Sequence, residues 1–111
     1  MIQEERGGWT VTYFSASCRV VKHDDFLHIH SLQTPPEDGG RGFATCVLNQ
    51  VKALAQREGY KGITLTAAPF GYRTLTYEQV LNFYQDHGFR IVQVFRAVWD
   101  KHATAKMELR F

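Results

Sequence analysis

The feature that most restricts the fold of this chain is a glycine-rich segment between strand-like and helical sequence. Residues 37–44 read Glu-Asp-Gly-Gly-Arg-Gly-Phe-Ala and pass directly into a helical pattern. The first turn of a helix has unpaired N–H groups and partial positive charge, and glycines let a phosphate approach the backbone closely. Arg41 adds a cation with planar donors. The segment therefore predicts either an anion site, most simply for pyrophosphate, or an ordinary turn.

The sequence from Trp9 to Thr34 predicts an antiparallel meander. β-branched and aromatic residues gather in short runs at 10–16, 18–22 and 26–33. Turn residues separate these runs, which is typical of consecutive strands. Short connections favour antiparallel pairing of such strands.

The sequence after the glycines predicts a helix followed by a buried strand. Apolar residues recur at helical spacing from Cys46 to Ala55, and Gly59 is expected to end the helix. Residues 62–67 form a short apolar run that suits a buried strand. A helix between two strands implies a crossover connection and parallel pairing.

A second helix and a final strand pair complete the pattern. Thr76 and Gln79 resemble a capping box at the start of this helix, and Gly88 is expected at its end. Two further strands are predicted within 89–99 and 105–111. Helices covering a mixed sheet correspond to an α/β layer arrangement in one domain that spans residues 1–111.

The composition excludes several classes of function. The net charge is only +2, and the basic residues are scattered, so nucleic-acid binding is not indicated. No apolar run is long enough to cross a membrane, and the N-terminus does not resemble a signal peptide. We therefore expect a cytoplasmic protein with no membrane partner. Cys18 and Cys46 lack metal-type spacing and are expected to be reduced.

The order of these elements resembles the GCN5-related N-acetyltransferase (GNAT) superfamily. Residues 39–44 resemble the family's Arg/Gln-x-x-Gly-x-Gly/Ala loop, although Gly39 replaces the usual Arg or Gln. Residues 82–89 look like the family's Phe-Tyr-x-x-x-Gly-Phe segment. The resemblance implies an α/β (α+β) acyl-CoA N-acyltransferase fold, which is a mixed, mostly antiparallel twisted sheet with helices on both faces.

The same resemblance implies acetyl-CoA as cosubstrate. The family holds the thioester with backbone N–H groups of the strand before the loop, which here are those of Leu32 and Thr34. The loop and the first helical turn would hold the pyrophosphate. The residues concerned are Gly39, Gly40, Arg41, Gly42, Phe43, Ala44 and Thr45.

Two histidines are candidates for the general base. His28 and His30 flank Ile29, and the side-chain period of two in a strand predicts that both face the same side. They resemble the His-x-His of arylalkylamine N-acetyltransferases. Histidine titrates near neutral pH and can accept an ammonium proton, but a histidine on a strand is also often an ordinary half-exposed residue. Two histidines without a third ligand make an incomplete zinc site, so no metal is expected.

Tyr84 is the candidate for the general acid. It resembles the family tyrosine that gives a proton to the coenzyme A sulfur, and a phenol is mostly protonated at neutral pH. The alternative is a helix residue whose ring packs on the sheet.

The resemblance leaves the acceptor and the activity open. The chain has only residues 1–8 before the first predicted strand, so the N-terminal strand and helices of the family are expected to be missing and the acceptor side open. The acceptor is then an amine, either a protein lysine or N-terminus or a small molecule, and a homodimer stays open. The alternative is a catalytically silent acetyl-CoA binder or a protein-interaction or inhibitor module, with a viral origin as one source.

Overall fold

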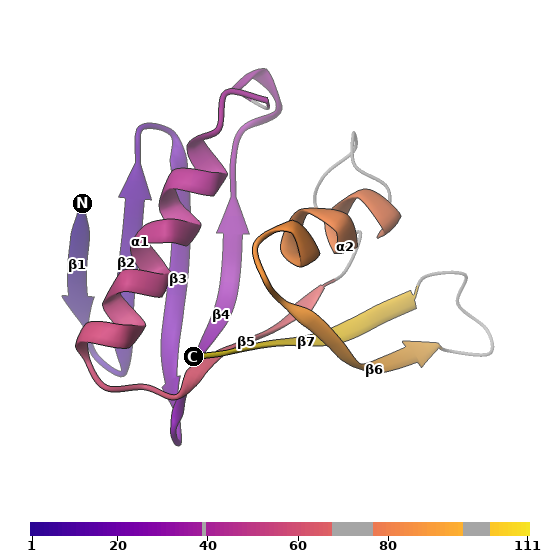
Figure 1. Cartoon of the computed structure of the whole chain (residues 1–111). Helices are drawn as coiled ribbons and strands as arrows, with labels where there is room; N and C mark the ends of the chain where they lie inside the picture. The colour runs from indigo at the N-terminus through magenta and orange to yellow at the C-terminus, as the bar shows by residue number, and fades with distance from the viewer. Residues whose placement is uncertain (39, 68–76, 97–102) are drawn as a thin grey trace. The chain divides into compact units, whose positions relative to one another are not determined.

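The computed structural model of the chain describes residues 1–38, 40–67, 77–96 and 103–111 (Figure 1). The bounds of its elements are β1 (Ile2–Glu5), β2 (Gly8–Tyr13), β3 (Ala16–His23), β4 (Phe26–Gln33), η1 (Pro36–Asp38), α1 (Phe43–Arg57), β5 (Gly62–Ala67), α2 (Tyr77–Asp86), β6 (Arg90–Arg96) and β7 (Ala103–Arg110). The strands are hydrogen-bonded in the order β1-β2-β3-β4-β5-β7-β6, and the predicted mixed, mostly antiparallel sheet with helices is confirmed. The chain divides into two units, Met1–Ile63 with Phe111 and Thr64–Arg110, which are described separately.

The expectation of a missing N-terminal strand is wrong. Ile2–Glu5 form β1, which pairs antiparallel with β2 from Ile2↔Val11 to Glu5↔Gly8. The strand is short, exposed and mostly polar, so it has no apolar alternation that sequence reasoning could detect. Its backbone hydrogen bonds to β2, rather than its side chains, define it.

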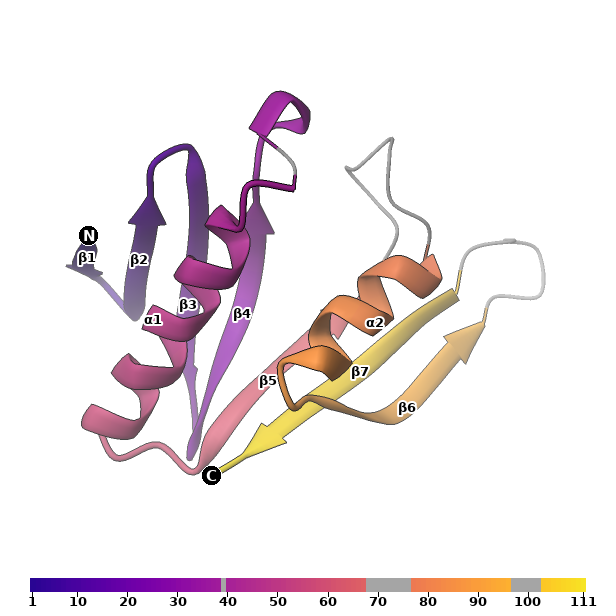
Figure 2. The ribbon, with the colours of Figure 1, turned by 45° about the horizontal axis from the view of Figure 1, so that its top comes forward.

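In the first unit, α1 packs on one face of the meander formed by β1 to β4 (Figure 2). Val47, Val51 and Leu54 recur every three or four residues and are almost fully buried, so they form the apolar stripe of the helix. They contact a sheet face whose alternate residues are also buried. These sheet residues are Trp9, Val11, Cys18, Val20, Leu27 and Ile29.

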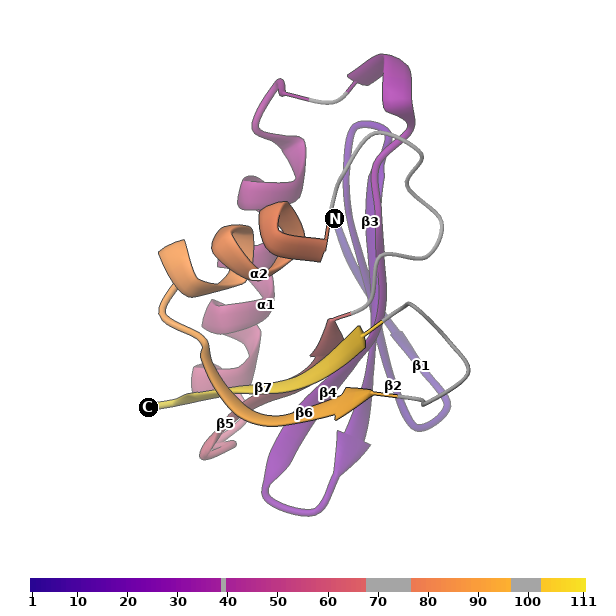
Figure 3. The ribbon, with the colours of Figure 1, turned by 90° about the vertical axis from the view of Figure 1, so that its right-hand side faces the viewer.

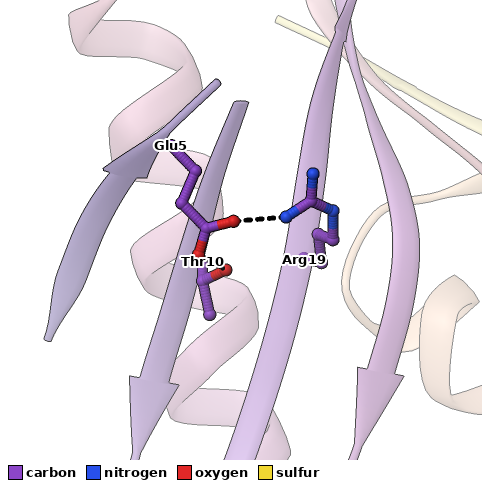
Figure 4. A network of polar contacts seen from close by, with 3 residues as sticks. All are labelled: Glu5, Thr10 and Arg19. Atoms are coloured by element: carbon purple, nitrogen blue, oxygen red, sulfur yellow. Dashed lines mark hydrogen bonds and ion pairs between the residues drawn. The ribbon is translucent and has the colours of Figure 1, made fainter. Parts of the chain in front are cut away.

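A polar network lies on the other face of the meander (Figure 4). The Thr10 hydroxyl donates a 2.6 Å hydrogen bond to the Glu5 carboxylate, and the Arg19 guanidinium donates another to the same group. The hydrogen bond from Thr10 lowers the pKa of Glu5, and Arg19 lowers it further. The network therefore links β1, β2 and β3 across their polar face.

Both helices end at the glycines that the sequence predicted. Gly59 and Gly88 have φ angles of +80° and +93°, a region that residues with a Cβ avoid. Beyond them, the Tyr60 N–H donates to the carbonyl of Ala55 at 2.9 Å, and the Phe89 N–H donates to that of Tyr84 at 3.0 Å. This is the Schellman arrangement, which satisfies carbonyls at a helix end.

The second unit contains α2 and the antiparallel pair of β6 and β7 (Figure 3). Phe89, Ala105 and Met107 are buried within it. The predicted capping residue Thr76 and the connection at 97–102 lie outside the described residues. The two strands predicted near the C-terminus are confirmed with somewhat different bounds.

Candidate functional site

A β-bulge interrupts β4 at His30. Arg19 of β3 pairs with Ser31, but the next residue, Val20, pairs with Ile29. His30 therefore has no partner on β3, and the strict alternation of side chains ends at this position. The bulge bends β4 just before the strand reaches the glycine loop.

The two candidate bases lie in different surroundings. His28 is half-buried and pairs with Val21, on the sheet face away from α1. Its ring centroid is 6.3 Å from that of His23. His30, the bulge residue, is exposed. The side-chain period of two in a strand predicts that both rings lie on one face. This period does not extend through the bulge, so the common orientation of the two rings stays a prediction.

The strand leads into the loop through Thr34. β4 ends at Gln33, and Leu32 and Thr34 are both half-buried. The Thr34 Oγ1 atom is buried and has no hydrogen-bond partner within the described part of the chain. A buried hydroxyl without a partner costs stability, so this atom is suited to a hydrogen bond with a bound molecule.

The loop presents the start of α1 without a capping side chain. The helix begins at Phe43, and its N-cap residue is Gly42, with φ +80° and no side-chain cap. Gly40 has φ +81°, and a Cβ added at either glycine would meet no atom within 4 Å. Both positions are thus open to a ligand and confined to glycine by the backbone. Gly39, the residue that departs from the family pattern, lies outside the described residues.

The charges at the loop are mixed. The Arg41 Nε atom lies 3.8 Å from a carboxylate oxygen of Asp38, and the Arg41 side chain is 64% exposed. The same carboxylate accepts a 2.6 Å hydrogen bond from the Ser15 hydroxyl, in the turn between β2 and β3. The sequence alone does not predict the contact between Ser15 and Asp38, because 23 residues separate them along the chain.

An aromatic cluster lies at the same end of the first unit. Phe14, which is 78% exposed, stacks on Phe43 with ring centroids 5.0 Å apart and planes inclined by 20°. Tyr13 contacts both rings edge-on. The first residue of α1 thus carries an aromatic platform that the sequence patterns did not predict.

Tyr84 lies in the second unit, on α2. It is 8% exposed, and its ring contacts Phe89 edge-on at a centroid distance of 5.7 Å. The ring is therefore packed against an aromatic residue of the same unit, and its packing on the sheet stays a prediction. The predicted role as an acid is compatible with this packing and stays a prediction.

Two kinds of feature are absent from the described residues. No group of three or more His, Cys, Asp and Glu side chains there could hold a metal ion. No described helix is long and apolar enough to cross a membrane.

Sequence comparison does not assign the chain to a family, but comparison with solved structures assigns its fold. No protein-family model matches it, and no curated protein matches it either. An acetyltransferase from Bacillus cereus ATCC 14579 aligns with 98% of this chain and 69% of its own length, at 21% identity and a TM-score of 0.75. The IAA acetyltransferase from the same organism aligns with 96% of this chain and 79% of its own, at 14% identity and a TM-score of 0.78.

A third structure adds a ligand. A protein from Bacillus anthracis str. Ames, described as a streptothricin acetyltransferase, was solved in complex with acetyl coenzyme A. It aligns with 86% of this chain and 55% of its own, at 17% identity and a TM-score of 0.72. This chain has the GNAT fold. The resemblance inferred from the two motifs is thereby confirmed at the level of the fold. The GNAT fold alone does not assign roles to residues at identities of 14 to 21%.

Proposed function

We propose that this protein is an acetyl-CoA-dependent N-acetyltransferase. The observation that carries the proposal is the start of α1, where Gly42 leaves the helix without a side-chain cap in a chain with the GNAT fold. Helix starts of this kind favour anions through their N–H groups and dipole. Gly40, Arg41, Gly42, Phe43, Ala44 and Thr45 would hold the pyrophosphate of the cosubstrate, together with Gly39.

The end of β4 fits the remainder of the cosubstrate. The Thr34 hydroxyl is buried without a partner among the described residues, and an amide of the pantetheine arm would satisfy it. The backbone N–H groups of Leu32 and Thr34 would bind near the thioester. When bound, acetyl-CoA supplies an acetyl group activated as a thioester.

The chain's own residues would move the protons. The acceptor amine must lose a proton, which His28 or His30 would accept, directly or through water. The thiolate that leaves must gain a proton, which Tyr84 would donate. We leave the acceptor as a primary amine, either on a protein or in a small molecule. A cytoplasmic location belongs to the same proposal and rests on the sequence alone, and the protein would act either as a monomer or as a homodimer.

One observation favours a catalytically silent binder as the alternative. The Asp38 carboxylate lies beside Arg41, so it offsets the cation nearest to the glycines. A carboxylate at this position opposes the binding of an anion, which would lower the affinity for the cosubstrate.

Two measurements separate these readings. Titration with acetyl-CoA should raise the melting temperature, because a ligand that binds only the folded state stabilises it. Incubation with acetyl-CoA and a panel of amines, peptides and cell lysate should then give acetylated products by mass spectrometry. Binding without acetylation of any acceptor supports the silent binder, and the absence of binding overturns both readings.

A further inference from the structure

The aromatic cluster at the tip of the β2–β3 hairpin has an unusual conformation. Phe14 has a φ angle of +52°, and it is the first of only two residues between the paired positions Tyr13 and Ala16. Glycine is preferred at such hairpin positions, and a bulky side chain at positive φ is an outlier. Outliers of this kind persist where the surrounding structure holds them and often mark functional positions.

The strained turn presents a flat ring to solvent. One face of Phe14 is stacked on Phe43, and the side chain is nevertheless 78% exposed. The stacking on Phe43 thus covers only a small part of the ring. The exposed area is instead a platform of the kind on which nucleic-acid bases stack.

The platform adjoins the proposed pyrophosphate site. Phe43 directly follows Gly42, the N-cap residue of α1. The hydrogen bond from Ser15 to Asp38 ties the hairpin tip to the turn that precedes the loop. A nucleotide whose phosphates lie on the start of α1 therefore has an aromatic surface within the same part of the first unit.

We propose that Phe14, supported by Phe43 and Tyr13, stacks on the adenine ring of coenzyme A. This inference rests on the proposed function, since it assumes that the anion at the start of α1 is the coenzyme's pyrophosphate. Stacking recognises the flat face of the base and needs no hydrogen-bonding side chain. Phe14 thus selects ligands that carry the nucleotide over those with the pantetheine arm alone.

The test compares ligands with and without the nucleotide. Calorimetry would measure the Kd of acetyl-CoA, of acetyl-4′-phosphopantetheine, which lacks the adenosine portion, and of adenosine 3′,5′-bisphosphate. Phe14→Ala should weaken the binding of acetyl-CoA and of the bisphosphate by about 5- to 150-fold, the range measured for removal of a stacking aromatic. The same substitution should leave the Kd of acetyl-4′-phosphopantetheine unchanged. Phe14→Trp should bind acetyl-CoA and the bisphosphate as well as the wild type does. Phe14→Leu should bind them as weakly as Phe14→Ala does.

A second exposed aromatic residue provides a matched control. Phe111 is also an exposed aromatic, 48% accessible, and its N–H donates to the carbonyl of Lys61, beyond the C-terminal end of α1, so Phe111→Ala should change none of the three affinities. An equal loss for all three ligands with Phe14→Ala would mean that the ring only supports the loop, and the proposal would be wrong. Unchanged affinities would also overturn it. If the wild-type protein binds none of the ligands, the proposed function is wrong as well. If it binds acetyl-4′-phosphopantetheine and Phe14→Ala does not weaken acetyl-CoA, only the role of Phe14 is wrong.

Discussion

The Ser15 hydroxyl donates a 2.6 Å hydrogen bond to the Asp38 carboxylate, and so connects the β2–β3 turn with the segment before α1. Asp38 also lies 3.8 Å from Arg41. This carboxylate is therefore the point at which a strand turn, the glycine loop and a loop cation meet. The shape of the proposed anion site depends on a contact between segments that are far apart in the sequence.

Ser15→Ala should loosen the glycine loop. The hydrogen bond is exposed, so its loss should lower the free energy of unfolding by about 1 kcal/mol or less. Hydrogen exchange of the backbone amides between Thr34 and Gly42 should become faster. Ser17→Ala is the control, since Ser17 lies on β3, where it pairs with Gln33 of β4. Equal exchange in the two variants would contradict a role for the Ser15 contact.

Gly42→Ala and Gly59→Ala form a matched pair. Both glycines have a φ angle of +80° and open space around a new Cβ, so each substitution should destabilise the fold by roughly 1 kcal/mol through backbone strain. Only Gly42 lies at the start of α1. Calorimetry should therefore show weaker acetyl-CoA binding for Gly42→Ala alone. Equal affinities in the two variants would mean that the anion site lies elsewhere.

Tyr84→Phe should slow acetyl transfer without weakening acetyl-CoA binding. The substitution removes only the hydroxyl, and general acid catalysis typically contributes about 10²- to 10⁴-fold to a rate. The measurements are kcat by steady-state kinetics and Kd by calorimetry. Tyr60→Phe is the control, because Tyr60 packs edge-on against Trp9 and has no proposed chemical role. An unchanged kcat would leave Tyr84 with its packing role against Phe89.

Substitution of both candidate bases should change the pH profile. His28→Gln with His30→Gln is expected to lower kcat/KM most at the acid end of the profile, where the amine is hardest to deprotonate. The single variants then show which histidine acts, the half-buried one or the bulge residue. His23→Gln controls for the neighbouring ring, 6.3 Å from His28. A loss that is the same at every pH argues against both histidines.

The Cys18 thiol should reduce stability at alkaline pH. Burial raises its pKa from 9.0 to about 12. Because the folded pKa is raised, the stabilisation is complete below pH 9 and is lost as the pH rises toward 12. Denaturant unfolding at a series of alkaline pH values should show a steeper loss in the wild type than in Cys18→Ala. Parallel pH dependences would show that the thiol ionises equally in both states.

The sequence predicted the elements whose signals are local. Gly59 and Gly88 end the two helices as expected, because a positive φ angle favours glycine wherever it occurs. The stripe of Val47, Val51 and Leu54 also follows from spacing alone. The strand at Ile2–Glu5 could not be predicted in this way, since its pairing partner defines it.

The candidate site likewise combines features that are local in the sequence with features that depend on tertiary contacts. The sequence alone determined the glycine loop before a helix and the histidine pair before that loop, because both are patterns of neighbouring residues. Only the tertiary structure decided that a bulge falls at His30, that the Thr34 hydroxyl is buried without a partner among the described residues, and that Phe14 stacks on Phe43. These features arise from strand register and from contacts between distant segments. No spacing along the chain encodes such contacts.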